Sequence, residues 1–203
     1  MAELKKYLVD TVAVRYRVNK DYKKPVRRFW TKALEEVGNG EAVLLIPEEV
    51  FHELEIQSFG FSAHNNKKEL DNIANVLEQC NVVPNITSTE IEHQLRKMAA
   101  YVRGNYKEDI DAGKGIEYPG VSDSRILCTA WRNDCVVVTA NIKDFMLLPL
   151  LDAPGEEILY DIVSSKYITV TEEAHQKIHS DETFKTMFRD LVKMVEKIED
   201  SET

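Results

Sequence analysis

Apolar residues occur along this chain in two patterns, short continuous runs and longer stretches with helical spacing. Four short runs predict buried strands, at residues 4–10, 42–46, 82–83 and 135–139. Three stretches place apolar side chains three and four positions apart and predict helices, at residues 25–37, 67–79 and 87–104. Strands that alternate with helices favour a mainly parallel sheet with helices on its faces. The pattern therefore predicts an α/β fold.

Local signals place the ends of several elements. Pro47 suits the first turn of a helix that leaves the second strand and carries Glu53. Residues 87–90 form a capping-box pattern, and Gly104 is expected to close the helix that follows. Residues 104–120 lack a period and are rich in glycine and charge, which predicts a loop or lid over any site near Asp123. The alternative is a surface insertion without a role.

The chain beyond residue 150 is predicted to be mainly helical. One helix is expected to start at residues 171–173, and a second carries a broad apolar stripe that consists of Phe184, Met187, Phe188, Leu191, Val192, Met194, Val195 and Ile198. We interpret residues 1–150 as one domain and residues 151–203 as an extension packed on it. The alternative is that the stripe forms a homodimer seam or a docking face for an inhibitory partner.

Composition narrows the class of protein. The 203 residues, 43% hydrophobic and 30% charged, are typical of a globular domain with a full core. No apolar stretch approaches the roughly 20 residues of a membrane span, and the start of the chain lacks the apolar part of a signal peptide, so we expect a cytoplasmic protein. Cys80, Cys128 and Cys135 are odd in number and lie in apolar segments, which favours core positions over disulfides or zinc ligands.

Acidic residues stand where a parallel sheet would bring them together. Asp10 ends the first strand, Glu53 follows the second, and Asp123 opens a helix for which Ser122 is a candidate cap. Beyond that helix, the predicted strand at residues 135–139 is followed closely by polar groups. They are the hydroxyl of Thr139, the amide of Asn141 and the carboxylate of Asp144. Ligands of open α/β sheets bind outside the carboxyl ends of the strands, so these side chains are candidates for one shared site.

The net charge of -9 argues mildly against a protein that coats nucleic acid, but its distribution is uneven. Cationic residues crowd one stretch after Asp10, namely Arg15, Arg17, Lys20, Lys23, Lys24, Arg27, Arg28 and Lys32. Tyr16, Tyr22, Phe29 and Trp30 interleave them, and aromatic faces stack unpaired bases. The alternative is a solvated helix face with Phe29 and Trp30 in the core.

Four blocks together resemble the PIN-domain ribonuclease family. They are residues 7–11 (YLVDT), 50–54 (VFHEL), 123–130 (DSRILCTA) and 137–145 (VVTANIKDF), within a resemblance that covers residues 5–150. The resemblance implies a three-layer fold with a central mainly parallel sheet flanked by helices, and cleavage of single-stranded RNA. Prokaryotic members are typically the toxins of toxin–antitoxin pairs, which implies an antitoxin protein as a partner.

By this resemblance Asp10, Glu53 and Asp123 would be metal-binding carboxylates. The family's fourth acidic position falls on Asn141, with Asp144 as the nearby acid, and either could complete the site. Thr139 would orient a carboxylate or a water. Val12 stands where the family commonly has Asn or Ser.

Elementary electrostatics supports a cation at such a site. Carboxylates about 4 Å apart repel by several kcal/mol at an effective dielectric constant of about 20, and a divalent cation removes that repulsion. Carboxylate oxygens suit Mg²⁺ or Mn²⁺, whereas zinc prefers imidazole and thiolate. The basic stretch would then guide RNA across the site. The preference for RNA over DNA comes from the resemblance alone.

Other interpretations stay open. One is a PIN-like scaffold that binds RNA or protein without cleavage, with Asn141 marking the loss of chemistry. A phosphoaspartate enzyme built on Asp10 would need a second acid at Val12. His175 and His179 are spaced to share a helix face, as zinc ligands or as part of an exposed polar face. Three acids of the Glu53 helix, Glu48, Glu49 and Glu55, are interpreted as solvated charges.

Overall fold

The computed structural model describes residues 4–18, 21, 23–63, 66–85, 87–110 and 115–202. Its strands form one sheet that consists of β1 (Lys5–Val9), β2 (Ala42–Pro47), β3 (Asn81–Val83), β4 (Val136–Thr139), β5 (Leu159–Asp161) and β6 (Lys166–Tyr167). The strand order is β3-β2-β1-β4-β5-β6; β6 is antiparallel to β5, and the other neighbours are parallel. The expected α/β class with a mainly parallel sheet is confirmed.

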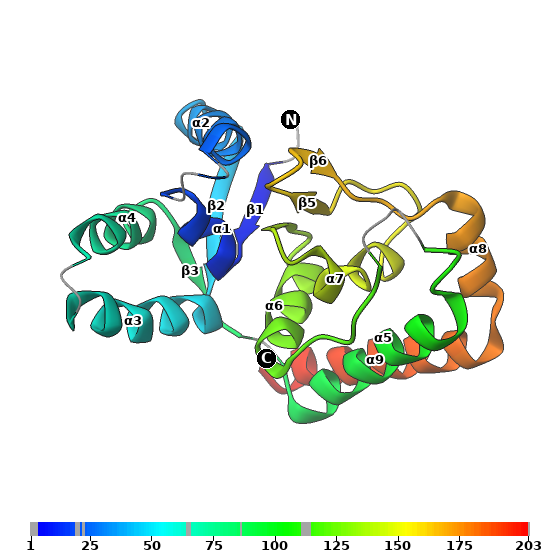
Figure 1. Cartoon of the computed structure of the whole chain (residues 1–203). Helices are drawn as coiled ribbons and strands as arrows, with labels where there is room; N and C mark the ends of the chain where they lie inside the picture. Colours follow the sequence, from blue (N-terminus) through cyan, green and yellow to red (C-terminus); the bar gives the residue numbers. More distant parts are fainter. Residues whose placement is uncertain are drawn as a thin grey trace.

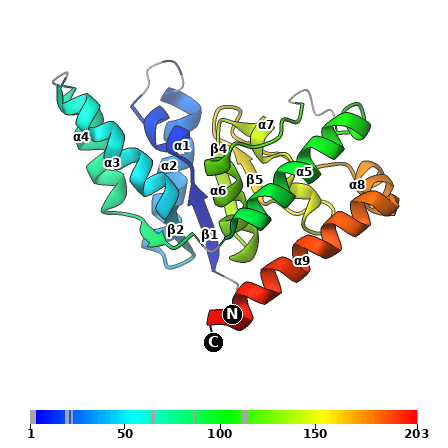
Figure 2. The same cartoon turned by 90° about the horizontal axis from the view of Figure 1, so that it is seen from below.

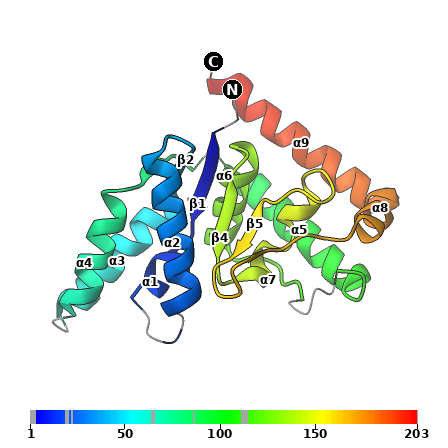
Figure 3. The same ribbon diagram turned by 90° about the horizontal axis from the view of Figure 1, so that it is seen from above.

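Helices cover both faces of the sheet. They are α1 (Thr11–Tyr16), α2 (Lys23–Gly38), α3 (Glu48–Ala63), α4 (Lys67–Leu77), α5 (Thr89–Tyr106), α6 (Val121–Arg132), α7 (Ile142–Phe145), α8 (Glu172–Ser180) and α9 (Glu182–Glu202), with a 3-10 turn at Leu148–Leu150. Helix α2 lies on one face, whereas α6 and α5 lie on the other (Figures 1, 2 and 3). The pair α3 and α4 stands at the opposite end of the molecule from α8 and α9 (Figure 1).

Burial on two faces explains the apolar strands. Leu8, Val9, Val137 and Val138 have no exposed surface, because helices cover the sheet on both sides. The parallel register sets Leu8 opposite Val137 and Val9 opposite Val138, so β1 and β4 end together. No helix in the described part of the chain is both long enough and apolar enough to span a membrane.

Helix α1 was missed by the sequence prediction. It begins directly after Asp10, whose backbone is extended and acts as the N-cap without a side-chain hydrogen bond. Its buried residues Ala13 and Val14 continue the apolar run of β1, so the change from strand to helix has no break in hydrophobicity. This short helix carries Arg15, the first residue of the basic stretch, in its last turn.

The expected end of the 87–104 helix was wrong. Helix α5 continues through Gly104 to Tyr106, because Met98 and Val102 on its inner face are fully buried and outweigh a cost of roughly 1 kcal/mol for one helical glycine. Residues 111–114 of the predicted loop lie outside the described residues. Residues 115–120 lack regular structure, and the backbone N–H of Glu117 donates to the carbonyl of Lys143 at 3.0 Å, which fastens this part to α7.

Two helix starts also differ from expectation. Ser88 is the N-cap of α5, since its hydroxyl accepts from the N–H of Ile91 at 3.3 Å. Helix α6 begins at Val121 after Gly120, earlier than a cap at Ser122 would place it.

The segment after residue 150 adds strands as well as helices. β5 extends the parallel sheet beside β4, and β6 closes its edge. Helix α9 packs along α5, as Figures 2 and 3 show, and the side-chain amide of Gln94 donates to the carbonyl of Met187 at 2.8 Å. Phe184 and Leu191 of the apolar stripe are fully buried there. The division at residue 150 stays a prediction.

Two phenylalanines give a matched test of this packing. Phe184→Ala should lower the free energy of unfolding by about 3–5 kcal/mol, because Phe184 has no exposed surface. Phe59→Ala should change it by less than about 0.5 kcal/mol, because Phe59 is 74% exposed on α3. Urea denaturation measures both changes, and equal losses would contradict the described burial.

Candidate active site at the carboxyl ends of the strands

The site lies where the strand order reverses direction. The chain passes from β1 outward to β2 and β3, then returns to β4 on the other side of β1. Such a reversal leaves a crevice outside the carboxyl ends of the two central strands, where open α/β sheets bind their ligands. Asp10 follows β1 and Thr139 ends β4, so both stand at this crevice. Glu53 comes from α3, and Asp123 from the first turn of α6.

The Thr139 hydroxyl joins the ends of β1 and β4. It donates to Oδ2 of Asp10 at 2.7 Å and accepts from the backbone N–H of Asn141 at 2.9 Å. The N–H of Asp10 donates to the carbonyl of Val138 at 3.1 Å. Asp10 is only 5% exposed and Thr139 is fully buried. The orientation of the Asp10 carboxyl is therefore set by β4 as well as by its own strand.

Burial and neighbouring acids raise the pKa of Asp10 to about 7. Burial is the largest cause, since it penalises the charged form, and the hydrogen bond from Thr139 opposes it. The negative charges of Asp123 and Glu53 raise the pKa further. The three carboxyl groups thus lie within electrostatic reach of one another around Asp10.

Asp123 links Asp10 to a further acidic group. Burial first, and then the charge of Asp144, raise the pKa of Asp123, against a hydrogen bond at 3.1 Å from the Gly120 N–H. Burial also raises the pKa of Asp144, and Glu117 adds to this effect by its charge. Glu117 was not among the predicted site residues. Its position at the crevice depends on the tertiary hydrogen bond to Lys143, which no local sequence signal indicates.

Short polar contacts hold the remaining acids. The Thr11 hydroxyl donates to Oε2 of Glu53 at 2.5 Å, and the Asn141 amide donates to Oδ2 of Asp144. Asn141 and Asp144 are thus neighbours that bond to each other. Within the described ranges, no group of three acidic, histidine or cysteine side chains is arranged to hold a metal ion as it stands.

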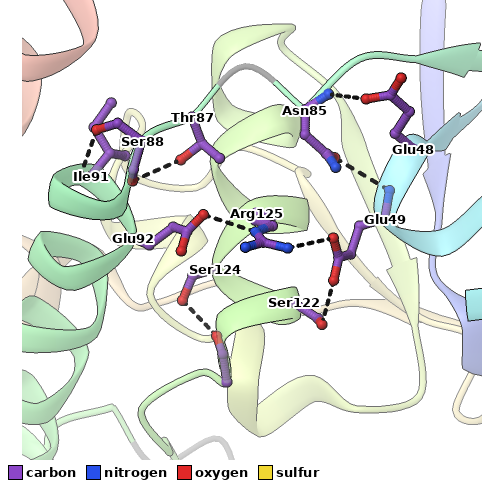
Figure 4. A network of polar contacts seen from close by, with 11 residues as sticks. Glu48, Glu49, Asn85, Thr87, Ser88, Ile91, Glu92, Ser122, Ser124 and Arg125 are labelled. Carbon is purple, nitrogen blue, oxygen red and sulfur yellow. Dashed lines mark hydrogen bonds and ion pairs between the residues drawn. The ribbon is translucent and has the colours of Figure 1, made fainter. Parts of the chain in front are cut away.

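A network of ion pairs joins α3, α5 and α6, the first and last of which carry Glu53 and Asp123 (Figure 4). Arg125 of α6 donates to Glu92 of α5 at 2.8 Å and to Glu49 of α3 at 2.9 Å. The Ser122 hydroxyl donates to the second oxygen of Glu49 at 2.5 Å. Burial opposes ionisation of Glu49, but the hydrogen bonds from Ser122 and Arg125 outweigh it and hold the pKa of Glu49 below its usual value.

The expectation that Glu48 and Glu49 are solvated charges was wrong. The Glu49 side chain is 15% exposed, and Glu48 accepts from the N–H of Asn85 at 3.3 Å (Figure 4). One signal was present in the sequence: Glu49 and Glu53 are four residues apart and share a helix face. The partners Arg125 and Glu92 come from other helices, so spacing along the chain could not identify them.

The basic stretch is divided between two helices. Arg15 on α1 is exposed, as are Lys24, Arg27 and Arg28 on α2. Lys20 and the side chain of Lys23 lie outside the described residues. The Arg17 guanidinium stacks over the Trp30 ring at 5.0 Å, and burial lowers its pKa. Phe29 and Trp30 are buried, which confirms the interpretation that these aromatics belong to the core.

Three shallow grooves lie on this side of the protein, one against α4 and two along α2. One, with a volume of about 560 Å³, is lined by Arg17, Val18, Lys67, Lys68, Asp71, Asn72 and Asn75. A second shares Arg17 with it and adds Arg27, and a third shares Arg27 and adds Lys24, Arg28 and Lys32. The shared lining residues make the cationic surface continuous from α4 to α2. Lys67 and Lys68 were not predicted, because they lie far along the chain from the basic stretch.

His175 and His179 are engaged with backbone carbonyls. Their rings stack 4.1 Å apart, and their Nε2 atoms contact the carbonyls of Asp152 at 2.9 Å and Leu150 at 2.8 Å. Burial lowers the pKa of His179. They fasten α8 to the segment before β5, and the expectation of an exposed polar face was wrong because His175 is only 7% exposed. The three cysteines are buried and carry no disulfide, as predicted.

No protein-family model and no curated protein sequence match this chain. Its fold is similar to three solved structures. VapBC2 from Rickettsia felis, bound to a DNA fragment from the promoter, is 17% identical, with 68% of this chain and 89% of that chain covered and a TM-score of 0.45. VapBC-1 from nontypeable Haemophilus influenzae is 21% identical, with 69% of this chain and 90% of that chain covered and a TM-score of 0.46. FitAcB from Neisseria gonorrhoeae is 16% identical, with 70% of this chain and 92% of that chain covered and a TM-score of 0.44. The similarity is one of general fold.

The raised pKa of Asp10 predicts a specific dependence of stability on pH. The folded protein keeps this proton up to about pH 7, whereas the unfolded chain releases it near pH 4, so this group stabilises the fold at low pH and that contribution is lost as pH rises through about 7. In metal-free buffer, Asp10→Asn should therefore raise Tm relative to wild type at pH 8, with a smaller difference at pH 5. Thermal denaturation across this pH range measures the effect.

Asp71→Asn is a suitable control, because Asp71 is exposed on α4. It should shift Tm by the same small amount at every pH. A constant difference between Asp10→Asn and wild type from pH 5 to pH 8 would show that Asp10 titrates normally.

Proposed function

We propose that this protein is a divalent-metal-dependent endoribonuclease that hydrolyses phosphodiester bonds of single-stranded RNA. One observation carries the proposal: Asp10, Glu53 and Asp123 couple electrostatically at the reversal point of the strand order, where Asp10 has a pKa of about 7. Burying like charges together destabilises a fold, so such a cluster is expected to serve a function. Strongly perturbed carboxyl groups in a crevice are typical of active sites.

The donor set fits a hard divalent cation. Every candidate side chain offers oxygen, which suits Mg²⁺ or Mn²⁺, and Cys80, Cys128 and Cys135 are buried in the core. Binding requires side-chain movement, because among the described residues no three of these side chains are arranged to hold a metal ion as they stand. When bound, the cation would lower the pKa of a water and offset negative charge on the phosphate.

Each residue then has a defined part. Asp10, Glu53 and Asp123 would contribute carboxylate oxygens to the cation. Thr139 would keep the Asp10 carboxyl oriented through its 2.7 Å hydrogen bond, a contact that fixes ligand geometry in metal sites. Asp144 and Asn141 would complete the site together, because they are already hydrogen-bonded to each other.

The cationic grooves would hold the substrate. Helix α1 leads from Asp10 directly to Arg15 and Arg17, and the grooves continue to Lys67 and Lys68 on α4. Lys and Arg that contact phosphates bind nucleic acid independently of sequence, in competition with salt. The choice of RNA rests on the resemblance of the four sequence blocks to PIN-domain ribonucleases.

The same resemblance supports a role as the toxin of a toxin–antitoxin pair. A partner peptide with Arg or Lys could occupy the acidic crevice, since charge-assisted hydrogen bonds to carboxylates are favourable. Expression in cells without an antitoxin should then arrest growth, and normal growth with active protein present would contradict this role.

A second candidate is a scaffold that binds RNA without cleavage. It is favoured by Asn141 at the family's fourth acidic position and by the lack of a closed ligand group among the described side chains. Metal-dependent cleavage separates the two candidates.

Cleavage should depend on the acidic cluster. Wild type with Mg²⁺ or Mn²⁺ should cut single-stranded RNA, and Asp10→Asn and Asp123→Asn should each reduce the rate at least about 100-fold, because each removes a charge that holds the cation. Gel analysis of a labelled RNA and DNA panel measures the rates.

Asp190→Asn should cut like wild type, because Asp190 is exposed on α9 and lines neither the crevice nor the cationic grooves. Inert wild type in both metals, or equal cutting by all variants, would favour the scaffold.

RNA binding should lose part of its salt dependence when α4 is neutralised. Without metal, Lys67→Gln/Lys68→Gln should weaken binding to every single-stranded sequence. It should also lower the slope of log K against log salt by about 1.4, or about 0.7 for each of the two phosphates that the protein no longer neutralises. Lys193→Gln/Lys197→Gln on α9 makes the same charge change far from the grooves and should leave the slope unchanged. Fluorescence anisotropy from about 50 to 200 mM salt distinguishes them, and equal slopes for both pairs would exclude α4 from the binding surface.

A further inference from the structure

Arg125 is the centre of contacts between three helices. Its Nε donates to Glu92 of α5 at 2.8 Å, and one of its terminal nitrogens donates to Glu49 of α3 at 2.9 Å. Figure 4 shows the guanidinium between the two carboxylates. The planar fork of an arginine can hold two carboxylates at fixed directions, which a lysine ammonium cannot.

These contacts lie close in sequence to two residues of the candidate site, Asp123 and Glu53. Asp123 lies between Ser122 and Arg125, and both of these bind Glu49. Glu49 stands four residues before Glu53, so the two glutamates share one face of α3. The network therefore joins the turn that carries Asp123 to the helix face that carries Glu53.

Apolar packing gives α3 little orientation of its own. Val50 and Leu54 are fully buried, but Ile56 is 71% and Phe59 is 74% exposed. Burial of these two residues sets which face of α3 meets the core, but burial is non-directional and does not by itself fix the exact rotation and tilt of the helix. Directional hydrogen bonds from α6 to Glu49 supply that specification at the end of α3 nearest the sheet.

We propose that Arg125 is a positioning residue that sets the separation of Glu53 and Asp123 by tying α3 and α5 to α6. The proposal rests on the proposed function, because the separation of these carboxylates matters only for binding a cation. The Arg125 guanidinium donates to Glu49 and Glu92, and it acts on the acids of the site through these two residues and the rigid helices that carry them.

A role limited to stability makes a different prediction. Ion pairs with partly exposed partners contribute little to folding, and the Arg125 side chain is 37% exposed. Loss of such a pair would lower Tm slightly without changing the affinity of folded protein for a cation. Positioning instead requires that cation affinity falls while the protein stays folded.

Binding of Mn²⁺ alone tests this, with electron paramagnetic resonance as a readout of unbound Mn²⁺ well below Tm. Arg125→Met should weaken Mn²⁺ affinity about tenfold or more, the scale seen when residues that orient metal ligands are removed. Arg125→Lys should restore little, because it keeps the charge and loses the fork. Lys177→Met breaks a 2.7 Å ion pair between α8 and Asp109, away from the crevice, and should bind like wild type.

The outcomes separate the two proposals. Wild-type affinity in folded Arg125→Met would overturn the positioning role and leave the nuclease proposal intact. Wild type that binds no Mn²⁺ would overturn the nuclease proposal itself. If Arg125→Met does not fold, Glu49→Gln is the second test. This variant removes the charge that pairs with Arg125 but keeps an oxygen that accepts from the Ser122 hydroxyl. Unchanged Mn²⁺ affinity in Glu49→Gln would contradict the positioning role.

Discussion

The buried carboxyl group of Asp10 is the constraint around which this structure is organised. A carboxyl that is 5% exposed loses the water that favours its charged form, and two further acids make ionisation harder still. The Thr139 hydroxyl offsets part of this cost with a 2.7 Å hydrogen bond. Since β1 and β4 are parallel neighbours in register, the residues that follow them meet at one edge, and the sheet itself delivers the hydroxyl to the carboxyl. A cation at this edge would remove the remaining repulsion, and this is the physical basis of the metal dependence that we propose.

Acidic and basic side chains occupy separate surfaces near Asp10. The crevice gathers acids from β1, α3, α6 and α7, whereas the surface of α1, α2 and α4 gathers arginine and lysine. Phosphodiesters carry negative charge, so under the proposed function this cationic surface would bind the substrate backbone and leave the acidic crevice free for a cation. Arg125 of α6 pairs with Glu49 of α3 and Glu92 of α5. In our proposal these ion pairs position the helices that carry Glu53 and Asp123.

The sequence predicted the elements whose hydrophobic pattern was continuous. The four parallel strands from residue 5 to residue 139 and most of the helices on the faces followed from apolar runs and helical spacing. Asp10, Asp123 and Thr139 were placed by their positions at element ends, and Glu53 by the helix that follows the second strand. The sequence failed where tertiary contacts override local signals. Gly104 lies inside α5 because the inner face of that helix is buried, and Glu117 reaches the crevice through a backbone hydrogen bond to Lys143. The partners of Glu49 lie on two other helices, so a charge that looks solvated in the sequence is an ion pair in the fold.

The central claim is that the gathered carboxylates form a cation site at the reversal point of the strand order. Anomalous diffraction from crystals grown with Mn²⁺ tests it most directly. We expect one or two peaks at this crevice, with carboxylate oxygens of Asp10 and Asp123 at roughly 2.1–2.3 Å, close to the distances typical of hard divalent cations. Thr139 should keep its hydrogen bond to Asp10, and Glu53 should turn from Thr11 toward the metal. Crystals at saturating Mn²⁺ with no peak at the crevice, and with Glu53 still bonded to Thr11, would contradict the account.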